Sequence, residues 1–405
     1  MMQNALEQNA RRMNLNHTQL LDQAQIALDR AKRAGASYAD IRLGETHRQY
    51  IKAKDDRLEN FDESALVGFG VRVLLEGCWG FYGAHQLDRA NLETGVERAL
   101  HNARATKIIQ NQPILLENLP AREATWIMPM AQDPFGISAE EKSALLLSIC
   151  AAARDEGADF CSASLSLARE ERLFANSLGA RIAQTRTRIF PSFKAIAIDP
   201  ERGQFSSRES LTPARSAGWE YILQAGLLEE ARSAGKEARA KLNAKHLTPG
   251  IYDIVIDPTN LWLTIHETIG HSTELDRVLG WEANFAGTSF IKPQMLNNLQ
   301  IGSELMTIIA DRSQAGGLST IGYDDDGAPA EAADFKIVEK GIFRNFQMAL
   351  GQAHLIGLPQ SNGCAYADSP TAFPIQRMPN ISLAPNPNKS TLEDLFKDIE
   401  NGIYI

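Results

Sequence analysis

One stretch of the chain, residues 251–277, constrains what this protein can fold into more than any other. An apolar, strand-like run ends at Asp257-Pro258, and Thr259 or Asn260 can cap the helical run that follows. The stretch therefore predicts a strand, a turn and a helix in direct succession.

The helical run carries His266, Glu267 and His271 in the pattern HExxxH. Two neutral imidazoles are suitable zinc ligands, and an adjacent carboxylate can take a proton from metal-bound water. His266 and His271 are therefore the candidate metal ligands, and Glu267 is the candidate general base. The short motif alone also fits an alternative without metal, in which the helix packs in a core and both histidines are hydrogen-bonded there.

The spacing of the two histidines requires a distorted helix. In the commoner HExxH pattern the ligands are four residues apart, whereas five residues at about 100° each place His271 roughly 140° around the helix from His266. The chain must therefore widen locally through a π-type bond from residue i to i+5, or bend. Gly270 makes either distortion easier because it has no side chain.

The composition is that of an ordinary water-soluble protein. At 405 residues the chain is long enough for two domains, and its net charge of -9 provides no electrostatic attraction for nucleic acid. No apolar run approaches the length of a membrane span, and residues 1–13 lack the apolar core of a signal peptide. The four cysteines have no CxxC spacing, which suits reduced thiols in a cytoplasmic protein: Cys78, Cys150, Cys161 and Cys364.

Ahead of residue 246 the hydrophobic pattern of helix, strands and helix occurs twice. The first set predicts a helix over residues 17–34, strands over 37–43, 47–54, 57–62 and 65–75, and a helix over 88–106. The second predicts a helix over 139–156, strands over 159–167, 171–176, 181–188 and 192–198, and a helix over 228–242. Residues 108–133 contain three prolines and are expected to be an extended connector.

The repeat suggests an internal duplication that forms one continuous curved sheet. The predicted fold class is α+β. Residues 1–245 are expected to form a sheet-rich, peptide-binding N-terminal domain with flanking helices, because an exposed sheet edge can take an extended peptide as an added strand. A Pro/Gly turn at residues 246–250 marks the boundary, and residues 246–405 are expected to form a mostly antiparallel β domain that carries the HExxxH helix.

Two acidic features accompany the motif. Glu274, three residues after His271, lies one turn further along the helix, where it could accept the second N–H of His271 or serve as a ligand itself. The alternative for Glu274 is a solvated helix carboxylate. Residues 324–326 are three aspartates in front of Gly327, and they form the second candidate cluster. A calcium site is not expected, because the ligand spacing of a calcium loop is absent. The alternative to a functional cluster is a turn whose acids face water.

The longer strings around these residues resemble the TldD side of the TldD/PmbA peptidase family, also called modulators of DNA gyrase. The resemblance rests on TIHETIGHSTELDR at 264–277, on GWEANFAGTSF at 280–290, on GGLSTIGYDDDG at 316–327, on SNGC at 361–364 and on RMPN at 377–380, and it extends from about residue 18 to the end. It implies a zinc metallopeptidase with a PmbA/TldE-like partner subunit or a second copy of itself, and N-terminal domains that limit access to unfolded or short peptides. It also suggests substrate contacts by Asp326, where the family more often has Glu, and by Arg377, which could alternatively anchor an acidic turn.

In this family the third zinc ligand is a cysteine in a segment that follows a G-I-Y-I strand, and this chain ends at residues 402–405 with that strand. The resemblance therefore predicts an incomplete C-terminal domain, with Cys364 or Glu274 as substitute candidates for the third ligand. The predicted function is zinc-dependent hydrolysis of peptide bonds in unfolded or small, modified peptides, with Glu267 activating a water held by zinc. The alternative is a truncated, inert peptide-binding or partner subunit, and a weaker third idea is a regulator that binds gyrase.

Overall fold

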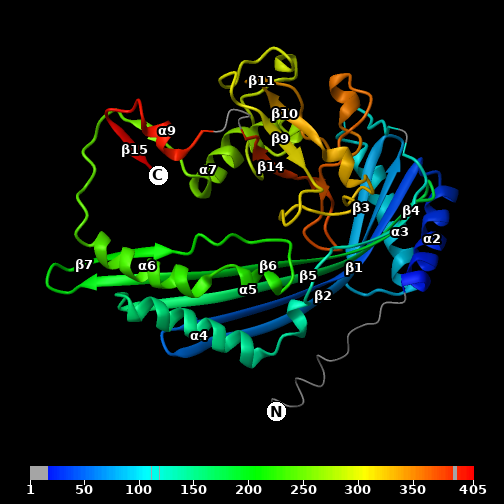
Figure 1. The fold of residues 1–405 in the computed structure, drawn as a ribbon. Coiled ribbons are helices and arrows are strands. Elements are labelled where there is room, and N and C mark those ends of the chain that lie inside the picture. The colour runs from blue at the N-terminus through cyan, green and yellow to red at the C-terminus, as the bar shows by residue number, and fades with distance from the viewer. Residues whose placement is uncertain (1–16, 111, 118, 386–389) are drawn as a thin grey trace.

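The computed structural model describes residues 17–110, 112–117, 119–385 and 390–405, so the predicted absence of a signal sequence over residues 1–13 lies outside the described residues. Its largest element is a curved sheet of seven strands, in the order β3-β2-β1-β5-β6-β4, with β7 also paired to β6 (Figure 1). The strands are β1 (Tyr38–Lys54), β2 (Arg57–Leu75), β3 (Cys78–Ala84), β4 (Glu123–Ile127), β5 (Phe160–Asn176), β6 (Arg181–Asp199) and β7 (Gln204–Glu209).

The long strands are continuous where the sequence pattern predicted breaks. Residues 37–43 and 47–54 merge into β1, since Gly44 continues the strand instead of ending it. A side chain at Gly44 would lie 2.2 Å from the carbonyl oxygen of Glu171, so glycine here permits β1 and β5 to approach closely. The predicted connector over residues 108–133 was wrong in one part, because β4 lies within it and pairs parallel to β6. None of the β4 side chains is fully buried, which explains why the apolar pattern did not reveal it.

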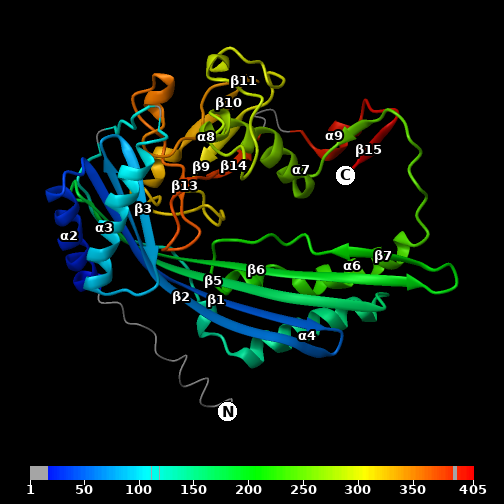
Figure 2. The ribbon, with the colours of Figure 1, turned by 180° about the vertical axis from the view of Figure 1, so that it is seen from behind.

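Four long helices cover the outer side of the curve (Figures 1 and 2). Two pack on the β1–β3 end and two on the β5–β6 end, each pair with its own apolar core. The long helices are α2 (His17–Arg33), α3 (Arg89–Thr106), α4 (Ala139–Asp155) and α6 (Leu227–Lys241), and a short helix, α5 (Glu220–Gln224), precedes α6. Gly35 and Gly157, both at positive φ, follow α2 and α4. The two halves therefore repeat one plan, and the antiparallel β1–β5 pair joins them into the continuous sheet that was predicted.

The rest of the chain forms small, mostly antiparallel sheets that lie on the inner side of the curve (Figure 2). A four-stranded sheet has the order β11-β10-β9-β14, β12 pairs with β13, and β8 pairs parallel with β15. The strands are β8 (Asp253–Val255), β9 (Ile308–Asp311), β10 (Phe335–Glu339), β11 (Ile342–Phe343), β12 (Ala365–Tyr366), β13 (Ile375–Gln376), β14 (Asn380–Leu383) and β15 (Gly402–Tyr404), and the helices are α7 (Pro258–Ile265), α8 (Leu275–Val278) and α9 (Leu392–Phe396). The fold is thus α+β. None of the described helices is both long and apolar enough to cross a bilayer.

Buried charges join the large sheet to the C-terminal elements. Arg72 of β2 binds Asp40 at 2.7 Å and Asp326 at 2.6 Å. Residues 324–326 had been considered as acids that face water, and this alternative was wrong: the three aspartates are only 3%, 8% and 4% exposed. They are tolerated because each accepts hydrogen bonds; Asp324, for example, accepts from the backbone N–H groups of Asp326 and Ala328.

Candidate metal centre

The helix that carries the motif begins earlier in the sequence than expected. Asp257, rather than Thr259 or Asn260, is the N-cap of α7, and its carboxylate accepts a hydrogen bond from the Thr259 N–H. Pro258 occupies the first turn, where its missing N–H costs nothing. The Asp-Pro pair therefore turns the chain directly from β8 into the helix.

The helix then widens at the motif, as the spacing predicted. Residues His266–Gly270 form a π-helical turn, η2, and the N–H of His271 donates to the carbonyl of His266 five residues earlier. The extra residue in this turn rotates His271 back towards His266. Their ring centroids lie 4.5 Å apart with the ring planes at 85°.

Potential ligand atoms of His266, Glu267 and His271 lie within 4.8 Å of one another, and no other such group of three occurs among the described residues. Burial lowers the pKa of His266, and the neighbouring His271 lowers it further, which favours the neutral imidazole that binds metals. Two imidazole nitrogens close to a carboxylate are a donor set that suits zinc. The residues present therefore fit a zinc ion.

A buried carboxylate holds the second histidine. Nδ1 of His271 lies 2.8 Å from Oε2 of Glu274, whose side chain is only 1% exposed. The same oxygen lies 2.5 Å from Nε of Arg277. Because Nδ1 of His271 is engaged by Glu274, Nε2 is the nitrogen left for a metal. Glu274 thus has the contact that was considered for a residue supporting a ligand, and the solvated alternative does not describe it.

The other candidate residues lie outside the group of His266, Glu267 and His271. Cys364 is fully buried with its thiol 3.5 Å from Asn362, and burial raises the pKa of that thiol to about 12. Asp326 belongs to the junction with Arg72, and its second oxygen accepts a hydrogen bond from the N–H of Leu350. The structure therefore does not bring Cys364 or Asp326 to the two histidines.

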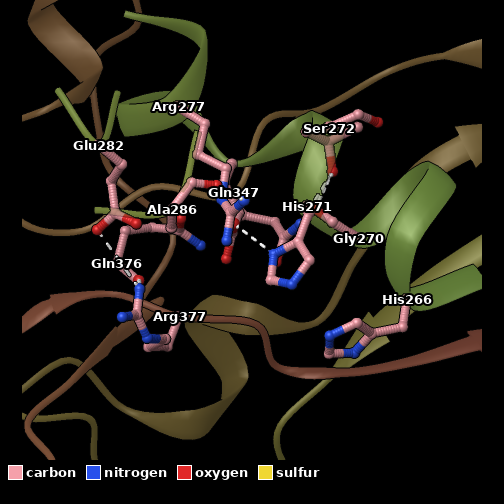
Figure 3. A network of polar contacts seen from close by, with 12 residues as sticks. His266, Gly270, His271, Ser272, Arg277, Glu282, Ala286, Gln347, Gln376 and Arg377 are labelled. Carbon is pink, nitrogen blue, oxygen red and sulfur yellow. Dashed lines mark hydrogen bonds and ion pairs between the residues drawn. The ribbon is translucent and has the colours of Figure 1, made fainter. Parts of the chain in front are cut away.

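Arg377 lies beside residues 282–285, in the segment that follows the HExxxH helix. One of its nitrogens is 3.5 Å from a carboxylate oxygen of Glu282, and its guanidinium is 5.8 Å from the ring centroid of Phe285. Figure 3 shows Arg377 and Glu282 in the same view as both histidines. This ion pair with Glu282 is the kind of acidic anchor that was the alternative to a substrate contact.

Sequence reasoning missed Gln347, which contacts the motif from a distant segment. Its side-chain amide donates to the carbonyl of Gly270 at 2.6 Å, across 77 residues of sequence. Nothing in the local pattern around residue 347 marks such a contact. A pairing of this kind can be read only from the folded chain.

A pocket of about 850 Å³ borders the candidate centre. Glu267 and His271 form part of its wall, and Arg277 is the charged residue next to them. Most of the remaining wall is apolar: Leu261, Ile265, Ile269, Phe290, Ile301, Leu305, Met306, Ile308 and Leu383. A carboxylate at the side of an open, largely apolar space is a suitable arrangement for binding an organic molecule.

Three family models match most of the chain. They are PmbA/TldA metallopeptidase domain 1 over residues 39–103, the central domain over residues 132–244 and the C-terminal domain over residues 249–405. The last of these contains the HExxxH helix.

Individual proteins agree with these matches. A protein of Methanothermobacter thermautotrophicus named metalloprotease is 28% identical over 368 residues, which are 91% of this chain and 76% of that protein. A zinc metalloprotease TldD homolog of Saccharolobus solfataricus is 24% identical, over 93% of this chain and 79% of its own length. The crystal structure of TldE from Thermococcus kodakarensis has the same fold, with a TM-score of 0.71 at 14% identity over 95% of this chain and 82% of that one. This chain therefore belongs to the TldD/PmbA family.

Proposed function

We propose that this protein is a zinc metallopeptidase that hydrolyses peptide bonds, with His266 and His271 holding the metal and Glu267 acting as general base. The observation that carries the proposal is the π-helical turn, which brings the two imidazoles and the carboxylate within 4.8 Å. The metallopeptidase names of the family models and the zinc metalloprotease name of one relative support the choice of reaction and metal.

Zinc, when bound, supplies the Lewis acidity that activates water and polarises the scissile carbonyl. The side chain of Glu267 is 60% exposed and borders the pocket, so it can reach a water molecule there. It would take the proton of the attacking water and return it to the leaving amine. Glu274 keeps His271 in one tautomer and orientation, because its carboxylate accepts a hydrogen bond from the Nδ1–H of His271.

The substrates we propose are unfolded or small peptides, including modified ones. The centre lies on the inner side of the curved sheet, which limits the approach of large folded partners (Figure 1). Arg377 is a candidate contact for a peptide carbonyl or carboxylate. We further propose that the protein works in the cytoplasm, to which its four free cysteines are suited, and that it assembles with a TldE-like subunit or with a second copy of itself.

Zinc content and peptidase activity of matched variants test this function. We expect the wild-type chain to retain about one zinc per chain in elemental analysis and to cleave an unstructured protein such as casein. His271→Ala should lose both properties, whereas Glu267→Gln should keep zinc and lose cleavage. His354→Ala, a histidine outside the metal group, is the control and should keep both. Wild-type chain that binds no zinc would refute the proposal.

One observation favours a second candidate, an inert peptide-binding subunit. A catalytic zinc site normally has three protein ligands, whereas the group here offers two histidines and the carboxylate assigned as the base. The inert subunit predicts peptide binding without zinc and without cleavage. Binding of a fluorescent unstructured peptide by zinc-free protein, unchanged by His271→Ala, would favour this second candidate.

A further inference from the structure

The end of the metal helix leaves several backbone carbonyls without a helical partner, because η2 is followed by only a short 3₁₀ turn, η3 (His271–Thr273). Side chains satisfy these carbonyls. The hydroxyl of Ser272 donates to the Thr268 carbonyl at 2.5 Å, and the hydroxyl of Thr273 donates to the Ile269 carbonyl at 2.7 Å. The shape of the segment therefore depends on specific side-chain hydrogen bonds.

Gln347 holds this segment at four points. Its side-chain amide donates to the Gly270 carbonyl at 2.6 Å and to the Thr273 hydroxyl at 2.9 Å. Its backbone N–H donates to the Thr273 carbonyl at 3.0 Å, and its own carbonyl accepts from the Leu275 N–H at 3.1 Å. Gln347 is completely buried, so water does not compete for these bonds.

These four bonds enclose the residues that set the position of His271. Gly270 closes the π-helical turn immediately before His271, and the bonds to Thr273 and Leu275 flank Glu274 on both sides. Glu274 has an extended backbone, with φ -70° and ψ 119°, and this conformation directs its carboxylate to Nδ1 of His271. Figure 3 shows Gln347 beside His271 and Gly270.

We infer that Gln347 is a positioning residue for the metal centre: it keeps the π-helical turn open and Glu274 in place, so that His271 faces His266. Its effect on a metal rests on the proposed function, but its effect on the backbone does not. Without the amide, the Gly270 carbonyl keeps only the longer bond from the Thr273 hydroxyl, at 3.2 Å, and the turn can relax towards regular helix, which rotates His271 away. Residues that support metal ligands in this way typically change metal affinity by about 10- to 100-fold when they are replaced.

The test uses Gln347→Met, which keeps the length of the side chain and removes the amide. The matched control is Gln376→Met, because Gln376 is 1% exposed and its amide has no hydrogen-bond partner within the described part of the chain. Thr273→Val is a second, nearly isosteric variant that removes one of the two groups to which the Gln347 amide donates. If Gln347→Met does not fold, Thr273→Val still removes the contact between Gln347 and Thr273, together with the bond from the Thr273 hydroxyl to the Ile269 carbonyl.

Two measurements separate this inference from the proposed function. In zinc-free protein, hydrogen exchange of the peptide covering residues 262–279 should be faster in Gln347→Met and Thr273→Val than in the wild type, and unchanged in Gln376→Met. With metal, competition against a chromophoric chelator should show about 10- to 100-fold weaker zinc binding in Gln347→Met, and the cobalt-substituted protein should have an altered ligand-field spectrum. Unchanged exchange would overturn the inference. Faster exchange in a chain that binds no zinc would support the backbone role and count against the proposed function alone.

Discussion

Nδ1 of His271 lies 2.8 Å from the buried carboxylate of Glu274. In the described part of the chain, the other acidic contact of a motif histidine, between His266 and Glu267, is longer, at 4.0 Å. This contact gives a residue three positions beyond the motif a role in orienting His271, one of the two histidines of the proposed metal site. It also helps to account for the burial of Glu274, because the same carboxylate oxygen lies beside both the His271 ring and the Arg277 guanidinium.

Replacing Glu274 with Gln should therefore weaken metal binding without unfolding the protein. The amide keeps the size of the side chain but loses the charge that strengthens the hydrogen bond to His271 and pairs with Arg277. We expect zinc affinity to fall by about 10- to 100-fold in chelator competition. Glu304→Gln, on the exposed surface, is the control, and an equal loss in both variants would contradict this role for Glu274.

A side chain at Gly270 should displace the end of the Met378 side chain. A Cβ added at Gly270 would lie 2.5 Å from Sδ of Met378, so one of the two must move. Because the atoms that must move are the flexible end of Met378, we expect Gly270→Ala to lower the free energy of unfolding by about 1 kcal/mol or less in urea titrations. In the double variant with Met378→Ala the cost should be smaller than the sum of the two single costs, and strict additivity would show that the contact does not matter.

Replacing Asp326, one of the two buried carboxylates that pair with Arg72, should destabilise the folded protein. Asp326→Ala leaves Arg72 with Asp40 as its remaining carboxylate partner and leaves the N–H of Leu350 without its acceptor. We expect a loss of about 3–5 kcal/mol in the free energy of unfolding. Asp398→Ala, in an exposed position, should change it by less than about 0.5 kcal/mol. Similar effects of the two variants would mean that Arg72 is satisfied without Asp326.

Glu170 is another buried carboxylate between the large sheet and the C-terminal elements, and it should make the stability of the protein depend on pH. Burial raises the pKa of Glu170, but Arg186, Arg188 and Arg172 outweigh burial and lower the pKa to about 2, against an unfolded value of about 4.3. Because the folded pKa is the lower one, the stabilisation is complete above about pH 4.3 and is lost as the pH falls towards 2, to a total of about 3 kcal/mol.

Urea unfolding at a series of pH values checks this dependence. The stability difference between the wild type and Glu170→Gln should be constant from pH 7 to about 5 and should shrink at lower pH. The hydroxyl of Tyr366, which also donates to Glu170 at 3.1 Å, provides a control, because Tyr366→Phe keeps the carboxylate and should preserve the pH dependence. A difference that stays constant down to pH 3 would contradict the assigned pKa.

Cys364 should not be needed for zinc. Its thiol has a pKa of about 12 because of burial, and the thiolate is the form that binds metals. We expect Cys364→Ala to retain the zinc content of the wild type in elemental analysis. Loss of zinc in this variant, with its fold intact by circular dichroism, would instead identify Cys364 as the third ligand.

The parts of the site that follow from local spacing were predictable from sequence. The five-residue separation of His266 and His271 required the helix to widen or to bend, and the structure has the widened turn. A contact between Glu274 and His271 was one of the possibilities that the sequence left open, and the structure has it, although the backbone at Glu274 is extended and not helical. The repeated helix and strand pattern likewise predicted the continuous sheet. The two site features depend on residues that are close in sequence, where geometry leaves few choices. The sheet was inferred from the repeat itself, because the strands that join its halves, β1 and β5, lie far apart in the chain.

Long-range contacts were not predictable in the same way. The pairing of Gln347 with Gly270, the use of Asp326 as a partner of Arg72 and the addition of β4 to the sheet each join segments far apart in the chain. The polar sequence around Asp326 allowed an exposed turn, and its partner Arg72, which lies 254 residues earlier in β2, could not be identified from the sequence. Burial of a charge depends on its partner, and a single sequence does not reveal that partner.

The β1–β5 pair at the centre of the sheet also affects folding during synthesis on the ribosome. Asp55 and Cys161, at one end of this pair, are 106 residues apart in sequence, and Ala39 and Ser177, at the other end, are 138 apart. At about 5–20 residues per second, a ribosome needs roughly 5 to 30 s to supply β5 after β1 has emerged. During that time β1 presents a long unpaired edge, to which β5 of a neighbouring nascent chain can bind in the same register. Closely spaced ribosomes on one messenger should therefore favour exchange of halves between chains, and slow initiation should favour monomers.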